Sequence, residues 1–293
     1  MRRRKVFYVY RMMMLHRNIV LQSRHNRSFL IDVFYQADRK AKPVVIFSHG
    51  FKGFKDWGPF DLIADRFAQA GFIFIKFNFS HNGTSIDHPF DFVDLEAFGH
   101  NNMSIEMDDL GVVLDWVNSE NFIVDGIETN TDKIYLLGHS RGGGITILKA
   151  QEDSRVKKIC TWASVNEFGK YWKKDEMEKI KHDGVIFVGN ARTNQQMPLY
   201  WQLYQNYFDN LERLHIPTAV KKIKIPFLII HGTDDETVPY TAALEMNQWN
   251  KQTQLLLLEH ANHNFGGCHP YNKDLLTDDL EDAISATIDF FKS

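Results

Sequence analysis

The feature that most constrains this chain is a short glycine-rich stretch near its middle. An apolar run at 133–137 leads into residues 138–142, which read GHSRG, and an apolar, helix-compatible stretch follows at 145–150. This order predicts a strand, a very tight turn and a helix, with Ser140 at the apex. Such a turn exposes a serine hydroxyl beside a helix N-terminus, which suits a nucleophile. It also occurs without any chemistry, so the rest of the chain must supply the partners of that serine.

Strand-like and helix-like segments alternate along most of the sequence. Apolar, often β-branched runs predict buried strands at 42–47, 72–77, 133–137, 156–163, 225–230 and 254–258. Helical spacing of apolar residues predicts helices at 60–70, 104–118, 240–249 and 278–291. Two antiparallel strands are expected before them, at 19–22 and 28–35. The alternation predicts an α/β fold with a mostly parallel central sheet and helices on both faces.

The alternation is interrupted between residues 164 and 224, a segment rich in aromatic and charged side chains. We interpret it as a helical cap inserted before the strand at 225–230, with a core made of 15–163 and 225–293. Its aromatic residues are expected either to form a small core of the cap or to line a substrate pocket. The candidate pocket residues are His139, Trp172, Trp201 and Tyr204.

Residues 1–14 are expected to lie outside the fold as a non-native or disordered extension. A basic start at 2–5 and apolar residues at 6–10 imitate a signal peptide. However, Arg11 and His16 interrupt the apolar part and no cleavage site follows. The methionines at 12–14 offer alternative translation starts. No later run is long and apolar enough to span a membrane.

Composition excludes several classes of function. The chain carries 34 basic and 37 acidic residues, and its net charge of −3 gives no reason to expect nucleic acid or an anionic membrane as partner. Two cysteines, Cys160 and Cys268, cannot form a disulfide framework and favour a reducing, cytoplasmic compartment. The spacing of His260, His263, Cys268 and His269 matches no common zinc pattern, so neither a metal nor a cofactor is expected.

A nucleophilic serine needs a base, an acid that orients the base, and N–H donors for the oxyanion. His263, in the loop after the last strand, is the expected base. It is favoured over His260, which directly follows that strand and is expected to be packed or solvated. The loop after the strand at 225–230 offers three adjacent acids at 234–236, and composition alone does not choose among them.

The oxyanion hole requires only backbone N–H groups. One is expected from Arg141, directly after the serine, and the other from Phe51 in the loop that follows the strand at 42–47. Because only the backbone is used, the identities of these two side chains are weak evidence for the role.

Taken together, these motifs resemble the α/β-hydrolase superfamily over nearly the whole chain. The matching pieces are His49-Gly50-Phe51, the GHSRG turn, the acid loop at 231–239 and His263, in the superfamily order of serine, acid and histidine. The superfamily acid-loop pattern, H-G-x-x-D-x-x-V-P, selects Asp235. The resemblance therefore implies an α/β-hydrolase fold with a catalytic triad of Ser140, Asp235 and His263.

Within the superfamily the chain looks most like carboxylesterases and dienelactone-hydrolase-like proteins, and the position of its insertion resembles that of cinnamoyl (feruloyl) esterases. Dienelactone hydrolases proper use a cysteine, and dehalogenases and epoxide hydrolases use an aspartate, so Ser140 argues against those reactions. The resemblance implies a serine hydrolase that cleaves small-molecule carboxylic esters, short-chain or aryl, through an acyl-enzyme. Acyl-peptide hydrolysis, acyl transfer by the same triad, and ligand binding without turnover stay open as alternatives.

Overall fold

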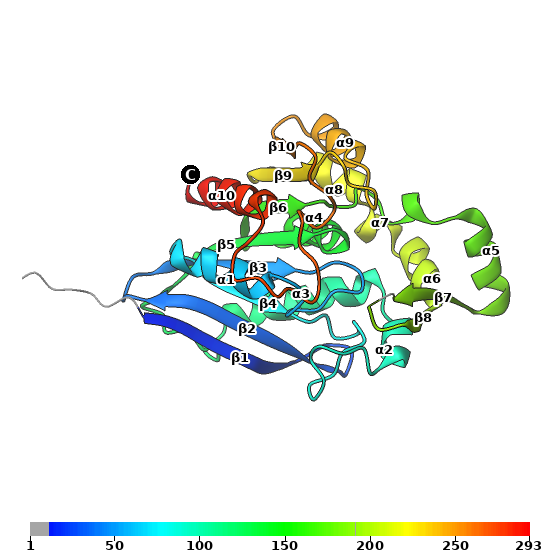
Figure 1. The fold of residues 1–293 in the computed structure, drawn as a ribbon, viewed down its shortest axis with the longest axis horizontal. Coiled ribbons are helices and arrows are strands. Elements are labelled where there is room, and N and C mark those ends of the chain that lie inside the picture. The colour runs from blue at the N-terminus through cyan, green and yellow to red at the C-terminus, as the bar shows by residue number, and fades with distance from the viewer. Residues whose placement is uncertain (1–11, 191) are drawn as a thin grey trace, which may run out of the picture.

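The computed structural model describes residues 12–190 and 192–293, and its centre is an eight-stranded sheet flanked by helices (Figure 1). The strands follow the order β1 (Met12–Gln22), β2 (Ser28–Ala37), β4 (Ile73–Phe77), β3 (Lys42–Ser48), β5 (Thr129–His139), β6 (Val156–Trp162), β9 (Phe227–Gly232) and β10 (Gln254–Leu258). β2 pairs antiparallel with β1 and β4, and the remaining neighbours are parallel. The structure therefore confirms the α/β fold with a mostly parallel sheet.

Alternate residues of the buried strands supply two separate cores, one on each face of the sheet. Val44 and Ile46 of β3 pack into one core, which also contains buried residues of α3 (Met103–Val117), α4 (Arg141–Glu152), α8 (Ile216–Lys222) and α9 (Thr241–Trp249). Val45 and Phe47 pack into the other core, which is covered by α1 (Phe60–Gln69) and α10 (Asp278–Lys292). Because both faces are covered, these strands read as continuous apolar runs in the sequence.

The N-terminal strand begins earlier than the sequence predicts. Met12 pairs with Ala37 and Met14 with Tyr35, so residues 12–14 belong to the sheet rather than to an extension. β1 is an edge strand with an exposed or half-exposed burial pattern and a register shift between His16 and Ile19, which weakens the alternation in its sequence. The remainder of the predicted extension, residues 1–11, lies outside the described residues.

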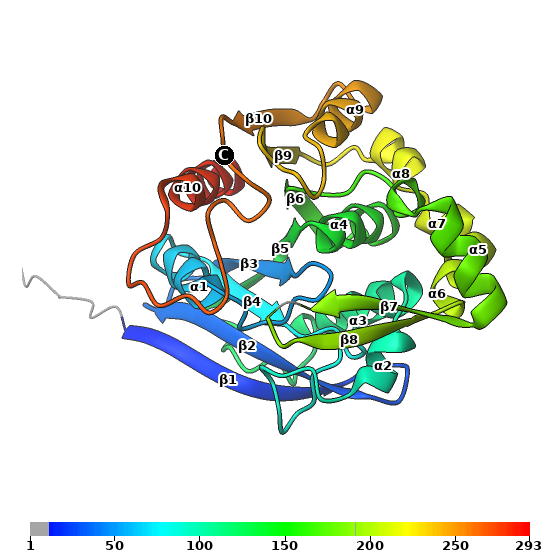
Figure 2. The same ribbon diagram turned by 45° about the vertical axis from the view of Figure 1, so that its right-hand side comes forward.

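The segment at 164–224 contains a pair of strands in addition to the helices that the sequence predicts for it. It contains η1 (Gly169–Tyr171), α5 (Lys174–Asp183), β7 (Val185–Asn190), β8 (Gln195–Tyr200), α6 (Gln202–Asp209), α7 (Leu211–Leu214) and α8. β7 and β8 form a separate antiparallel hairpin beside α2 (Leu95–Gly99) (Figure 2). The short helix α2 lies outside the elements that the sequence predicts. Among the described residues, no helix has the length and apolarity needed to cross a bilayer.

Candidate active site

Ser140 lies in the turn between β5 and α4. Its backbone has φ 56° and ψ −122°, a combination that residues with a side chain rarely adopt. The Ser140 N–H donates to the carbonyl of Trp162 at 2.9 Å, and its carbonyl accepts from the N–H of Gly143 at 2.9 Å. These hydrogen bonds hold the serine in this strained conformation, which is the one expected of a nucleophile elbow.

The glycines of the elbow are required by close backbone contacts. A Cβ on Gly142 would overlap the carbonyl oxygens of Ser48 and His49, and a Cβ on Gly138 would overlap the carbonyl oxygen of Gly142. The start of α4 is thus pressed against the end of β3, and only glycine allows this approach.

Three loops bring Ser140, His263 and Asp235 into one hydrogen-bonded chain. His263 Nε2 lies 3.0 Å from Ser140 Oγ, and His263 Nδ1 lies 2.7 Å from Asp235 Oδ2. The distances fit an imidazole that donates from Nδ1 to the carboxylate and accepts the serine hydroxyl at Nε2. All three residues are at least mostly buried. These separations are the ones that a histidine base would need between an orienting carboxylate and a hydroxyl group.

Asp235 is held in its ionised form by its surroundings. Its Oδ1 accepts the backbone N–H groups of Thr237 and Val238 at 2.9 and 2.8 Å. Its Oδ2 also lies 3.1 Å from Nε2 of the fully buried His231. Burial opposes ionisation, but the hydrogen bonds from His231 and His263 outweigh it and hold the pKa of Asp235 well below its ordinary value. His231 was not predicted as a partner, although it belongs to the same acid-loop motif.

The alternative candidates for the base and the acid, His260 and Asp234, contact each other instead. His260 Nδ1 lies 3.3 Å from Asp234 Oδ2, and both side chains are largely exposed, with 78% and 57% of their surface accessible. The same two loops therefore hold one exposed pair, His260 and Asp234, and one buried pair, His263 and Asp235.

A cluster of three carboxylates elsewhere has the dimensions of a metal site, but a lysine ammonium fills it. Asp32, Asp56 and Asp61 bring one oxygen each within 4.8 Å of one another. Lys76 Nζ contacts all three of them, at 2.8 Å for Asp32 and Asp61 and with a very short hydrogen bond to Asp56. The cluster is thus a buried ion network rather than a fit for a metal ion. It contains none of the residues at 260–269.

The loop with Phe51 packs directly against the elbow. A Cβ on Gly50 would lie 3.0 Å from Ser140 Cβ. His49 stays neutral because burial lowers its pKa to about 4, and its Nδ1 donates to the Gly50 carbonyl at 2.9 Å. Arg141 is the first residue of α4, where N–H groups have no partner within the helix. The backbone N–H groups of Phe51 and Arg141 remain our predicted oxyanion donors.

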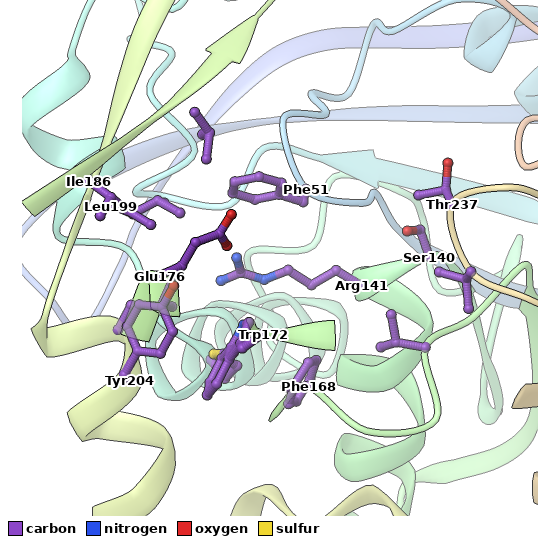
Figure 3. Close-up of a pocket in the computed structure, with 15 residues that line it drawn as sticks. Phe51, Ser140, Arg141, Phe168, Trp172, Glu176, Ile186, Leu199, Tyr204 and Thr237 are labelled. Carbon is purple, nitrogen blue, oxygen red and sulfur yellow. The ribbon is translucent and has the colours of Figure 1, made fainter. Parts of the chain in front are cut away.

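Ser140 lies on the wall between two hollows. The first is a cavity of about 270 Å³ lined mainly by apolar side chains, among them Met103, Val165, Phe168, Leu199 and Leu203 (Figure 3). The second, of about 500 Å³, has a more polar lining that includes Lys52, Asn190, Arg192, His263 and Asn264. Ser140, Phe51 and Thr237 line both. A substrate bound at Ser140 can therefore extend in two chemically different directions.

The four predicted pocket residues fall in three different places. Trp172 and Tyr204 line the apolar cavity, whereas His139 lines the polar hollow. His139 Nε2 donates to the His263 carbonyl at 2.9 Å, and burial lowers the pKa of His139 to about 3, so it supports the loop that carries His263 as a neutral side chain. Trp201 is not among the described residues that line either hollow. It stacks on Tyr204, with 5.8 Å between ring centroids.

Two charged residues of the apolar cavity, Arg141 and Glu176, were missed as pocket residues. Arg141 was predicted only for its backbone, and Glu176 sits among the many exposed charges of α5. No local pattern in the sequence distinguishes their side chains from solvent-facing ones.

Comparison with protein-family models matches residues 60–280, more than half of the chain, to the prolyl oligopeptidase family. The chain belongs to this family. Comparison with curated protein sequences returns no significant match. For this prolyl oligopeptidase family member, the motif order read from the sequence and the family assignment agree on a hydrolase of the α/β-hydrolase kind.

Solved structures similar to this family member share its fold at low sequence identity. An esterase domain from Rhodothermus marinus aligns with a TM-score of 0.63 at 15% identity, covering 95% of this chain and 98% of the other. Est1E from Butyrivibrio proteoclasticus with bound ferulic acid gives 0.62 at 18%, covering 96% and 95%. A putative dienelactone hydrolase from Klebsiella pneumoniae gives 0.60 at 13%, covering 96% and 99%. These similarities establish the α/β-hydrolase fold.

Proposed function

We propose that this protein is a serine hydrolase that cleaves carboxylic esters of small molecules. The observation that carries the proposal is the continuous hydrogen-bonded chain from Ser140 through His263 to Asp235, with separations of 3.0 and 2.7 Å. A serine without such partners is a poor nucleophile near neutral pH. The strained elbow, the two hollows beside the serine and the family assignment support the same assignment.

In the first half of the proposed reaction, His263 Nε2 accepts the hydroxyl proton while Ser140 Oγ attacks the ester carbonyl. The backbone N–H groups of Phe51 and Arg141 stabilise the negative oxygen that forms. Asp235 keeps His263 in the required tautomer and stabilises its positive charge. The tetrahedral intermediate collapses when His263 returns the proton to the departing alcohol oxygen, which leaves Ser140 acylated.

In the second half, a water molecule attacks the acyl-enzyme. His263 takes one proton from the water, the oxyanion forms again on the same donors, and the C–O bond to Ser140 breaks. Ser140 Oγ recovers its proton from His263, and the carboxylic acid is released. Each half-reaction uses the same three side chains, so losing any of them blocks both.

The cavity beside Ser140 supports a proposal for the substrate class. Its volume of about 270 Å³ is slightly below the usual range for ligand sites, which favours a short acyl chain or a single aromatic ring. Residues 164–224 serve in this proposal as the cap, because Phe168, Trp172 and Tyr204 come from that segment and form part of the cavity wall. Short-chain and aryl (cinnamoyl-type) esters are the expected substrates.

Active-site labelling with a fluorophosphonate tests the nucleophile. We expect the wild type to be labelled and Ser140→Ala to be unlabelled, with ester hydrolysis reduced by on the order of 10⁴-fold or more. His263→Ala should behave similarly. The matched control is His260→Ala, since that histidine is exposed and paired with Asp234. Equal labelling of the wild type and Ser140→Ala would refute the mechanism.

The family assignment favours testing amide substrates beside esters, because the triad selects the nucleophile and not the leaving group. A panel of short alkyl, aryl and feruloyl esters, together with acyl-peptides, distinguishes between these possible activities. Faster cleavage of acyl-peptides would make peptidase activity the main function, and acyl transfer to added alcohols would indicate a transferase. A protein that binds these compounds and turns none over would be a binding protein.

We also place this enzyme in a reducing, cytoplasmic compartment. Both cysteines are free: Cys160 is buried within the sheet and Cys268 is exposed in a loop. An exposed free thiol is kept reduced most readily in such a compartment. Localisation of the tagged protein in its own cells tests this placement.

A further inference from the structure

The side chain of Arg141 lies inside the apolar cavity rather than in solvent. In Figure 3 it runs from the Ser140 end of the cavity towards the end lined by Glu176 and Tyr204. Arg141 is only 9% exposed, and its guanidinium carbon lies 5.5 Å from the ring centroid of Phe51. A residue that was predicted only for its backbone therefore forms part of the cavity wall with its side chain.

The positive charge of Arg141 is already balanced on one side. Its Nε donates to Oε2 of the buried Glu106 at 3.1 Å, and Glu106 Oε1 accepts from Asn101 Nδ2 at 2.8 Å. Burial raises the pKa of Glu106, and the positive charge of Arg141 opposes that rise. This ion pair fixes the guanidinium in place through its Nε.

One of the two terminal nitrogens of that guanidinium is buried without an acceptor. Arg141 Nη2 is buried and has no hydrogen-bond partner among the described residues. Leaving a buried charged donor without an acceptor is costly, so a ligand oxygen placed there would gain a strong hydrogen bond. Most of the surrounding cavity wall is apolar and has no acceptor to offer.

We propose that Arg141 determines which acyl groups the enzyme accepts. Its guanidinium, beyond the Nε that binds Glu106, donates to a neutral oxygen, such as an ether, carbonyl or hydroxyl oxygen, that lies several bonds from the ester carbonyl. The oxygen is neutral because Glu106 already balances the guanidinium, and Glu176, the other charged residue on this cavity, is itself paired with Lys173 at 3.2 Å. The inference rests on the ester hydrolase function proposed above. It gives the residue after the nucleophile a second task beyond its backbone N–H.

A matched series of esters tests the proposal. The series comprises p-nitrophenyl octanoate and analogues in which one methylene in the outer half of the chain is an ether oxygen. We expect the wild type to have a higher kcat/KM for at least one ether ester than for octanoate. Arg141→Met keeps the length of the side chain but removes its donors. It should lower the ether-to-octanoate ratio about tenfold to a hundredfold, mainly through KM.

Two further variants separate recognition from misfolding. Arg141→Met combined with Glu106→Gln leaves no unpaired buried carboxylate, and it should show the same lowered ratio with a cooperative thermal unfolding transition. Glu106→Gln alone keeps the Nη2 donor, so the preference for ether esters should persist. A ratio that stays within twofold of the wild type in both Arg141 variants would overturn the proposal. So would a preference of the wild type for the mono-ester of octanedioic acid, which carries a carboxylate.

Calorimetric binding to Ser140→Ala protein distinguishes a failure of this inference from a failure of the proposed function. In one outcome, the wild type hydrolyses no ester, but Ser140→Ala binds the ether ester more tightly than octanoate and loses that preference when Arg141 is also replaced. The inference then stands and the proposed function is wrong. If the wild type hydrolyses the esters but neither kinetics nor binding depends on Arg141, the function stands and the inference is wrong. Absence of binding by any ester also overturns the inference.

Discussion

Two neighbouring aspartates in one loop illustrate how much a single side chain depends on its surroundings. Asp235 is buried and accepts hydrogen bonds from two backbone N–H groups and from His263. Asp234 is exposed, and its contacts are with Thr233 and the exposed His260. The same carboxyl group is therefore a fixed anion at one position and a solvated charge at the next.

Replacing these two aspartates by asparagine should have very different effects. Asp235→Asn removes the charge that orients His263, and kcat should fall on the order of 10⁴-fold because the wrong tautomer of the histidine becomes favoured. Asp234→Asn should change kcat by less than twofold. Steady-state kinetics with a p-nitrophenyl ester, accompanied by circular dichroism spectra, measures both. Similar losses in the two variants would contradict the assignment of the acid.

At the scale of elements, the active site depends on how closely α4 approaches β3. The elbow glycines permit this contact, and the loop at 49–51 rests on the same turn. Ser140 and the predicted oxyanion donor Phe51 are therefore positioned by one packing interaction rather than by two independent loops.

An added methyl group at Gly142 should disturb Ser140 and the loop at 49–51 together. In Gly142→Ala the new Cβ would overlap carbonyl oxygens of β3 and of the loop that follows it, so we expect the free energy of unfolding to fall by roughly 1–3 kcal/mol and ester hydrolysis to be lost. The control is Gly126→Ala, where a Cβ would meet no atom within 4 Å. Urea unfolding and a hydrolysis assay on both variants provide the measurement. A stable, active Gly142→Ala protein would refute this packing argument.

The sequence predicts best those elements in which burial constrains nearly every residue. β3 and the second half of β5, residues 134–138, are buried on both faces, so their apolar runs are unmistakable, and the elbow needs its glycines at fixed spacing. Exposed elements leave weaker patterns, which explains why residues 12–14 and the hairpin of β7 and β8 were missed. The side chain of Arg141 could not be placed either, because its burial results from Glu106 and Phe51, which are distant in the sequence.

At the scale of the whole molecule, an ion network around Asp32 joins the antiparallel part of the sheet to α1. Asp32 on β2 is fully buried and bonds Lys76 on β4 at 2.8 Å and Lys55 at 2.9 Å. Burial opposes ionisation of Asp32, but the two lysines outweigh it and lower its pKa from 3.8 to about 2. A carboxyl group whose pKa is lower in the folded protein stabilises the fold above its unfolded pKa.

The stability of the fold should therefore decline in a defined acidic range. The contribution of Asp32 is fully present above about pH 4 and is lost as the pH falls towards about 2. Asp32→Asn should lose about 3–5 kcal/mol at pH 7, because two buried lysines are left with fewer partners, and its stability should depend less on pH within that range. Urea unfolding at pH 7, 4, 3 and 2 tests this. If the free energy of unfolding changed equally with pH in the wild type and the variant, the expectation would be wrong.

The wall shared by the two hollows has a consequence for the order of events in catalysis. If the acyl group occupies the apolar cavity and the alcohol the polar hollow, the alcohol departs while the acyl group is still attached to Ser140. The vacated chamber then admits whichever small nucleophile reaches it, either water or a second alcohol. The ratio of hydrolysis to transesterification is accordingly a property of that one chamber, and it can be altered by changing Lys52 or Asn190 without changing which acyl groups are accepted.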